Sequence, residues 1–309
     1  MGSELITERP PGDRVTAADA TSAPATASDA PTEPRPEIWF RRRLDLRTQL
    51  REVWQFRELA LTLAERDLRA RYKQALLGFA WAILTPLMLM VAFTFVFTRF
   101  AKVDSHGVSY ALFAYVGLLP WTFFNSAVSS GGSSIVNNMP VLNKVYSPRE
   151  LFPLAAIAVA AVDALLSVSV LGVIFLLTHT APHVEGLYVV VLVPVLLIFT
   201  LAITLATSAV LVFLRDLRHA LPLLLQFALF ATPVAYGLDA ITHNSRAFLL
   251  VYSALNPLGP VIDGFRRTLL FGRPPDWPAL GIGAASSLVL LAASYKLFKR
   301  LETGFADIA

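Results

Sequence analysis

One carboxylate stands alone in a long apolar stretch, where its charge needs a polar partner or water. Asp163 lies within AAIAVAAVDALLSVSV, which carries no other charge. A carboxylate within lipid is costly, so it faces the protein interior or a water-filled path. Two roles fit this position: hydrogen bonding to a Ser or Thr of a neighbouring helix, or lining a translocation path. A proton-coupled carrier would need several such groups, and only Asp163 qualifies here.

Motifs for enzyme and metal chemistry are missing. The sequence contains no GxxxxGK[ST] loop to cradle nucleotide phosphates, no HExxH and no GxSxG. His179 and His183 have i, i+4 spacing, but Pro182 lies between them and no carboxylate is placed to orient them. We therefore expect no metal site. The absence of cysteine excludes disulfides and cysteine metal sites.

Aromatic side chains gather near the outer ends of the first two apolar stretches. Such rings stack on sugar rings, and they also form interface belts and lipid contacts. Phe93 and Phe97 share one helical face, and further aromatics follow from Tyr110 to Phe124. The candidates for the lining of a path are Phe93, Phe97, Tyr115, Trp121 and Phe124, together with Asp163.

The elements that must position these residues are membrane helices. The chain is 55% hydrophobic and 16% charged, with a mean hydropathy of +0.59, whereas soluble domains carry about 25% charged residues. Uncharged apolar runs longer than about 18 residues can cross a bilayer. Such runs predict an all-α integral membrane protein with six spans, near 77–98, 109–130, 151–177, 187–213, 219–238 and 279–298.

Basic residues set the direction of threading. Arg66, Arg69, Arg71 and Lys73 immediately precede a stretch without charge that lasts until Arg99. Positively charged loops stay in the cytoplasm. With both termini inside, twenty of the 26 Lys and Arg residues lie on the inner side and six outside. We therefore predict that both ends of the chain lie in the cytoplasm. The net charge of +4 arises from basic residues that fix the orientation in the membrane, so it does not indicate nucleic-acid binding.

The N-terminal region divides into two parts. Residues 1–36 are rich in Ala, Pro, Thr and Asp and lack the apolar core of a signal peptide, which predicts a disordered cytoplasmic tail. Residues 37–76 begin with an amphipathic helix over about 39–56, with Leu46, Leu50 and Trp54 on one face and arginines elsewhere. This pattern suits the lipid headgroup layer, or alternatively the surface of a small cytosolic cap.

The region between the fifth and sixth spans, 239–278, is interrupted. Asn256-Pro257 and Gly259-Pro260 break it, and its apolar pieces at 247–255 and 261–271 are too short to cross a membrane. They predict a pair of re-entrant or interfacial helices. The cytoplasmic loops at 143–150 and 215–218 are short, charged and dotted with apolar residues, which suits either simple solvated loop ends or docking into a groove of a partner.

Four blocks of the sequence resemble the ABC-2 type permeases that export polysaccharides and polyol phosphates, such as O-antigen, teichoic acid and capsule-like glycans. The blocks are RDLRARYKQALLGFAWAILTPLMLMVAFTFVF, LLPWTFFNSAVSSGGSSIVNNMPVLNKVYSPRELFPLAAIAVAAVD, FLRDLRHALPLLLQFALFATPVAYGL and NPLGPVIDGFRR. They occur in the family's order, and the resemblance covers about residues 58–309. Residues 1–36 lie outside it.

The resemblance implies a transport subunit rather than an enzyme. Residues 77–309 would form the transmembrane domain of a homodimer in the bacterial inner membrane, with two copies of a separate ATPase holding ATP and Mg and no cofactor on this chain. The substrate would be a glycan linked to polyprenyl diphosphate. The residues implied to contact the ATPase are Asn143, Lys144, Tyr146, Arg149 and Glu150. Those implied at the cytosolic entrance are Arg66, Arg69, Arg71 and Lys73, and those at the re-entrant exit are Asn256, Pro257, Asp263 and Arg266.

Two alternatives remain open beside the secondary carrier. One is an ABC-2 permease for a small drug or lipid. The other is a membrane-embedded glycosyltransferase, which would need acidic residues near the membrane surface, and Asp239, Asp263 and Asp276 are the candidates. Asp263 lies beside Arg266 and Arg267, so a local ion pair is the simpler explanation for it.

Overall fold

The computed structural model describes residues 51, 53–73, 78–101, 107–142, 147–178, 183–214, 216–242 and 245–305. The chain divides into two compact units, Met1–Asp45 and Leu46–Ala309, and all described residues belong to the second. The predicted tail 1–36 and most of the predicted amphipathic helix at 39–56 therefore lie outside the described residues.

Every regular element of the described part is a helix. The long helices are α3 (Ala80–Val96), which continues as the π-helical turn η2 (Phe97–Ala101), α4 (Tyr110–Gly132), α7 (Leu151–Leu177), α8 (Val189–Phe213), which follows the 3-10 turn η3 (Val184–Tyr188), and α13 (Trp277–Glu302). The shorter helices are α2 (Arg57–Lys73), α5 (Ser134–Asn137), α6 (Met139–Leu142), α9 (Leu217–Ala231), α10 (Asp239–Thr242), α11 (Arg246–Leu255) and α12 (Leu258–Leu269).

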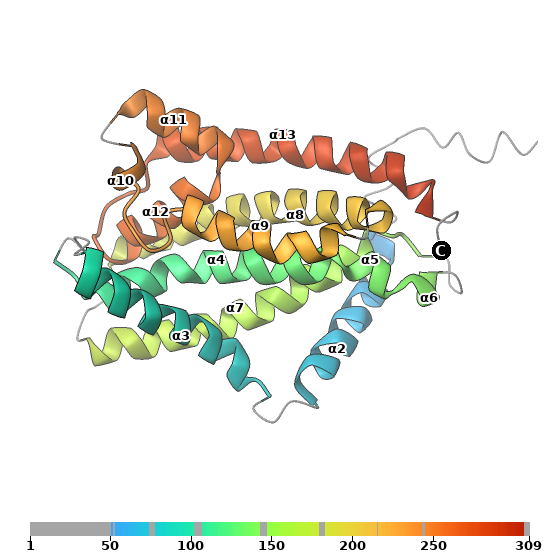
Figure 1. The fold of residues 1–309 in the computed structure, drawn as a ribbon, viewed down its shortest axis with the longest axis horizontal. Coiled ribbons are helices and arrows are strands. Elements are labelled where there is room, and N and C mark those ends of the chain that lie inside the picture. The colour runs from blue at the N-terminus through green and yellow to red at the C-terminus, as the bar shows by residue number, and fades with distance from the viewer. Residues whose placement is uncertain are drawn as a thin grey trace, which may run out of the picture. The chain divides into compact units, whose positions relative to one another are not determined.

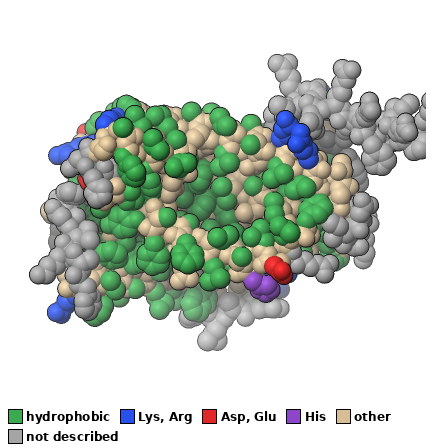
Figure 2. Space-filling model, turned by 45° about the horizontal axis from the view of Figure 1, so that its top comes forward, with side chains coloured by type: hydrophobic (Ala, Val, Ile, Leu, Met, Phe, Trp, Pro, Cys, Tyr) green, Lys and Arg blue, Asp and Glu red, His purple; other side chains and the backbone are tan. Residues whose placement is uncertain are grey.

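The prediction of an all-α membrane protein is confirmed. Among the described residues, five helices are long and apolar enough to cross a bilayer: α3 with η2, α4, α7, η3 with α8, and α13. The pair α11 and α12 adds a sixth if it counts as one span. Figure 2 shows one face of the molecule on which hydrophobic side chains cover most of the middle and charged side chains lie toward the two ends.

The fifth predicted span, 219–238, is shorter than expected, because α9 has only 15 residues and ends at Ala231. The backbone carbonyls of Pro233, Val234 and Tyr236 instead accept hydrogen bonds from the guanidinium of Arg266. A continued helix would use those carbonyls within itself. Pro233 ends α9, because proline cannot continue a helix and holds Thr232 before it in an extended conformation. Arg266 then binds the carbonyls of the segment that follows the helix.

Helix α4 is the centre of the described bundle. In Figure 1 it runs between α7, α8 and α9. Helices α2 and α3 slope away from the bundle and form a V, with the end of α2 and the start of α3 near its tip. Of the most apolar 18-residue window of α4, 78% is buried, against 11% for α3. α4 therefore packs against protein over most of its surface, whereas α3 leaves most of its apolar surface for lipid or another chain.

The bundle has two distinct ends (Figure 1). At the end called here the α6 end, α2 begins, α5 and α6 lie, and α13 finishes. At the opposite end, the α12 end, α10, α11 and α12 gather. Helices α11 and α12 meet at 114° across Asn256 and Pro257, so the structure has two short helices in the region where the sequence predicts them. Their re-entrant placement in a membrane stays a prediction.

Candidate functional site

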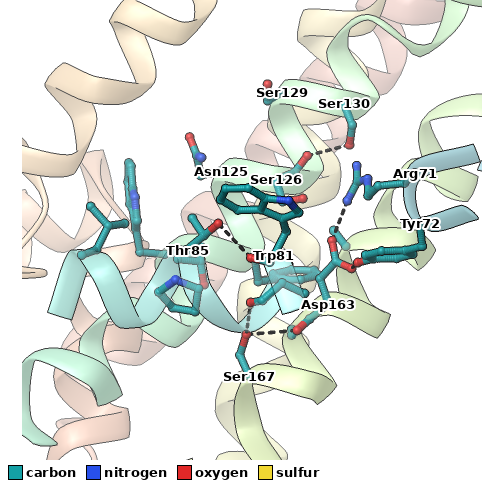
Figure 3. Close-up of a pocket in the computed structure, with 18 of the residues that line it drawn as sticks. Arg71, Tyr72, Trp81, Thr85, Asn125, Ser126, Ser129, Ser130, Asp163 and Ser167 are labelled. Atoms are coloured by element: carbon teal, nitrogen blue, oxygen red, sulfur yellow. Dashed lines mark hydrogen bonds and ion pairs between the residues drawn. The ribbon is translucent and has the colours of Figure 1, made fainter. Parts of the chain in front are cut away.

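A groove lined by both polar and apolar side chains lies along one face of α4. Its first part is a cavity of about 580 Å³ between the end of α2, α3, α4 and α7 (Figure 3). The second part, about 560 Å³, extends toward the α6 end between α2, α4, α5 and α7. Arg71, Ser130 and Ser133 line both cavities, so the two are adjacent. We call the two cavities together the serine groove.

The wall that α4 gives to the groove is made of small polar side chains. Residues three and four positions apart share one face of a helix. On this face α4 carries Thr122, Asn125, Ser126, Ser129 and Ser130, and its C-cap residue Ser133 follows. The Ser130 hydroxyl donates to the Ser126 carbonyl at 2.6 Å, and that of Ser133 donates to the Ser129 carbonyl at 3.2 Å. Each hydroxyl oxygen keeps acceptor capacity toward the cavity.

The lone intramembrane carboxylate is neutralised by the end of α2. Asp163 Oδ2 lies 2.5 Å from Arg71 Nη1, and the Tyr72 hydroxyl donates to the other carboxylate oxygen (Figure 3). From the sequence we expected a Ser or Thr to bind the Asp163 carboxylate. The Ser167 hydroxyl instead donates to the backbone carbonyl of Asp163 at 3.1 Å. Burial, and then the hydrogen bond to Asp163, raise the pKa of Tyr72 to about 12, so the phenol stays a donor at any physiological pH. Asp163 thus lines the groove and also joins α7 to α2.

The positive charges of the groove are balanced. Besides the Arg71–Asp163 pair, Arg66 Nη2 lies 2.7 Å from Asp67 Oδ1 and donates to Asn138 Oδ1 at 2.6 Å. Of the other basic residues predicted at the entrance, Arg69 pairs with Glu65 on α2, and Lys73 is exposed at the end of that helix. The groove therefore presents a neutral polar wall rather than a cationic one.

One exposed aromatic faces the serine groove. Trp81, in the first turn of α3, is 51% exposed and lines the larger cavity, where its ring lies over the space beside Ser126 (Figure 3). Of the aromatics predicted from the sequence, Trp121 also lines this cavity, although it is buried.

The other predicted aromatics lie in the packed core of this chain. Phe93 contacts Phe97 edge to face at 5.9 Å, Tyr115 is buried and donates to the Ser167 carbonyl, and Phe124 stacks on Phe199 at 5.5 Å. None of these four predicted residues lines either cavity of the groove. Hydropathy and ring content do not distinguish a core position from a cavity wall, which is why the sequence pointed to them.

At the α6 end, the structure describes only two of the predicted coupling residues. Asn143, Lys144 and Tyr146 lie outside the described residues. Glu150 forms an ion pair with Lys299 of α13, and the Arg149 guanidinium donates to the Glu302 backbone carbonyl. Both side chains therefore contact the last helix of the same chain.

At the α12 end, the predicted exit residues hold the chain together. Arg266 is 2% exposed and lies over the Phe113 ring, 3.8 Å from its centroid. Asn256 donates to Thr232 Oγ1 at 2.9 Å, Pro257 precedes the first residue of α12, and Asp263 lies 3.6 Å from Arg267.

The three aspartates considered for a glycosyltransferase also lie at this end. Asp263 and Asp276 each face arginines, and Asp239 lines two small cavities of about 250 Å³ with Asp263 and Arg267. Burial raises the pKa of Asp276, but hydrogen bonds from Arg246 and from the Ala279 backbone outweigh it, so this pKa lies below its ordinary value. In the described ranges, no group of three His, Asp or Glu side chains is arranged to hold a metal ion.

Comparison with known proteins assigns the family. A family model described as the ABC-2 type transporter matches residues 58–270. The chain belongs to the ABC-2 transporter membrane family. This match begins in α2 and extends just beyond α12, so in this ABC-2 protein both walls of the serine groove and the α12 end lie within the family's common region.

Relatives of this ABC-2 protein are export permeases. It is 34% identical over 260 residues to the O-antigen export system permease protein RfbA of Myxococcus xanthus, covering 84% of this chain and 98% of that protein. It is 25% identical over 252 residues to RfbA of Klebsiella pneumoniae, covering 81% and 95%. It is 25% identical over 243 residues to the polysialic acid transport protein KpsM of Escherichia coli, covering 77% and 91%. The predicted family is confirmed.

The sequence reasoning missed the main wall of the site in this ABC-2 protein. The hydroxyl stripe of α4 has a readable signal, because Thr122, Ser126, Ser129 and Ser133 recur at spacings of three and four within an otherwise apolar helix. Trp81 has a weaker one, since a tryptophan near the start of a span also suits the lipid interface.

Proposed function

We propose that this chain is the membrane permease subunit of an exporter that moves a polysaccharide across the bacterial inner membrane, driven by a separate ATP-binding subunit. The polysaccharide would be carried on polyprenyl diphosphate, as the family resemblance implies. The observation that carries the proposal is the serine groove, which has a neutral wall of hydroxyl and amide side chains on α4 and one exposed tryptophan on α3.

The chemistry of the groove suits a sugar chain. Pyranose rings present hydroxyls around their edges and C–H groups on their faces, so hydroxyl and amide side chains bind the edges while an aromatic ring stacks on a face. Ser129, Asn125 and Trp81 offer these groups around one cavity. A small apolar drug would favour a wall with fewer hydroxyls.

The decisive experiment pairs export with ATP hydrolysis. The purified chain alone should hydrolyse no ATP, and with its co-expressed ATP-binding subunit it should form a complex that does. Export of labelled, lipid-linked O-antigen into vesicles should then fall at least about tenfold in Trp81→Ala, and much less in Trp81→Phe, because a second aromatic ring retains the stacking surface. Phe227→Ala is the matched control, since Phe227 is an exposed aromatic of α9 that lines neither cavity of the groove and lies outside α3.

Three results would contradict the proposal. Nucleotide hydrolysis by the chain alone would exclude a permease that depends on a partner. Export that is equal in Trp81→Ala and Phe227→Ala would exclude the groove as the path. Export of a small drug with no movement of glycan would favour the other kind of ABC-2 permease.

We further propose that two copies enclose the path, with the α6 end of each in the cytoplasm. The apolar side chains that α3 leaves exposed, among them Met88 and Val91, support a contact with a second copy. Because the chain has no cysteine, single cysteines test both points. Met88→Cys should form a disulfide-linked dimer whereas Leu165→Cys, equally exposed on α7, should not.

In intact cells, an impermeant maleimide should label Arg273→Cys and leave Arg300→Cys unlabelled, and the reverse labelling would overturn the orientation.

A further inference from the structure

The most buried ion pair in the described part of the chain lies at the α6 end, outside the serine groove. Glu150 immediately precedes α7, and its Oε1 pairs with Nζ of Lys299 in the last turns of α13. The two side chains are only 5% and 15% exposed. Both residues therefore act within the protein, and Glu150 cannot be reached by a docking partner while this pair is formed.

Further contacts surround this pair. Lys299 Nζ also lies 2.9 Å from Glu302 Oε2, and the Tyr295 hydroxyl donates to Glu150 Oε1 at 3.4 Å. Arg149 donates to the Glu302 carbonyl, and its guanidinium lies over the Phe305 ring at 5.3 Å. We call this group the α7–α13 clamp: Arg149, Glu150, Tyr295, Lys299, Glu302 and Phe305.

The charged groups of the clamp contribute little net stability, because burying them has a large desolvation cost. Removing two charges from water costs several kcal/mol, so an apolar pair of similar volume often stabilises a protein as well or better. Glu150 Oε2 is moreover buried without a hydrogen-bond partner, which adds a further desolvation cost. Such a pair is better explained by the position that it fixes, the end of α13 relative to the segment 147–150, than by stability.

The opposite end of α13 is tied in the same manner. Asp276 caps the helix by accepting from the Ala279 N–H at 3.1 Å, and the same carboxylate accepts from Arg246 Nη2 of α11 at 3.0 Å and lies 3.8 Å from Arg267 of α12. Between these ties α13 is one unbroken helix of 26 residues, and it runs the length of the bundle from the α12 end to the α6 end (Figure 1).

We propose that Glu150 and Lys299 are positioning residues that carry a displacement of residues 147–150, which lead into α7, along α13 to helices α11 and α12. A continuous helix moves as a rigid rod, so a shift imposed at the clamp reappears at Asp276, about 35 Å away at 1.5 Å per residue. The inference rests on the proposed function, because the ATP-binding subunit, docked on the cytoplasmic side at the α6 end, supplies the displacement. It assigns Glu150 an action through α13 instead of a contact with the ATPase.

The test uses a reporter on α11 and needs no substrate. Val251→Cys places the only cysteine on an exposed position of α11, where it is labelled with bimane. In complex with the ATP-binding subunit, addition of ATP and vanadate should change the bimane emission. The variant Glu150→Gln/Lys299→Met removes both charges together, which spares the fold the unpaired buried charge that a single substitution would leave.

The expected result separates movement from hydrolysis. In Glu150→Gln/Lys299→Met the complex should form and hydrolyse ATP within about twofold of the parent, while the bimane response falls at least about fivefold, the lower range of allosteric coupling. Asp276→Asn should lower the response similarly from the far end of α13. Lys296→Met is the matched control, because it removes an exposed positive charge from the same end of α13 without touching the clamp, and its response should equal that of the parent.

Two results would overturn the inference. An unchanged bimane response in the doubly neutral variant would show that the clamp transmits nothing. A response that falls together with complex formation and hydrolysis would assign the clamp to ATPase docking. Failure of the proposed function is visible separately, because the parent chain itself would then neither bind the ATP-binding subunit nor respond to ATP.

Discussion

Replacing Arg266 with lysine tests whether this one side chain organises the α12 end. The guanidinium donates to the carbonyls of Phe113 at 3.2 Å, Pro233 at 2.8 Å, Tyr236 at 2.8 Å and Val234. An ammonium has three donors for these four acceptors. At least one buried carbonyl then stays unpaired, at a cost of ~1–3 kcal/mol.

The lysine also loses the stacking of the planar guanidinium on Phe113, which contributes ~0.5–2 kcal/mol. We therefore expect Arg266→Lys to lower the free energy of unfolding by about 2–4 kcal/mol. For a protein of this size, each kcal/mol shifts the unfolding temperature by ~2–4 °C. The transition in detergent, followed by tryptophan fluorescence, should accordingly fall by about 5–15 °C.

The neighbouring arginine gives a matched control. Arg267 is one-third exposed and lies 3.6 Å from Asp263, and partly exposed pairs of this kind contribute under ~1 kcal/mol. Arg267→Lys should therefore shift the transition by about 3 °C or less. Equal transitions for Arg266→Lys and Arg267→Lys would refute the argument that the buried arginine joins the segment after α9 to α4 and α12.

Three further predictions address packing and charge. Asp163→Asn should lower the unfolding temperature, because it removes charge-assisted hydrogen bonds worth ~1–3 kcal/mol. In a variant already lacking the Arg71 charge the same change should not lower it, because it then removes an unpaired, largely buried carboxylate. The pKa of Asp276 is lower in the folded protein than its ordinary value, so the ionised carboxylate stabilises the fold at any pH above that ordinary value. This stabilisation is lost as the pH falls through the pKa of Asp276 in the folded protein. The difference in unfolding temperature between the parent and Asp276→Asn should thus be constant from pH 7 to 5 and disappear at more acidic pH. A Cβ at Gly131 would overlap the Thr204 methyl, whereas one at Gly172 meets nothing within 4 Å, so Gly131→Ala should cost ~1–3 kcal/mol and Gly172→Ala should stabilise by up to ~1 kcal/mol in the same unfolding measurement.

Features that depend only on neighbouring residues were readable from the sequence. The apolar runs that became α3, α4, α7, α8 and α13 were predicted close to their observed bounds, because the length of an uncharged run decides whether it can cross a bilayer. The family was readable for a similar reason, since its motifs are contiguous blocks. The break between α11 and α12 also followed from local residues, because proline and glycine interrupt a helix wherever it packs.

Contacts between distant parts of the chain were decided only by the tertiary structure. Arg71 reaches Asp163, Lys299 reaches Glu150, and Arg266 binds the carbonyls of the segment that follows α9. The groove could not be predicted for the same reason, because an aromatic side chain has the same hydropathy in the core and on a cavity wall. The sequence by itself thus determined which five segments form helices long and apolar enough to cross a bilayer, since that depends on the run of residues alone. Which side chains face the groove depends on how the helices pack, and no single segment carries that information.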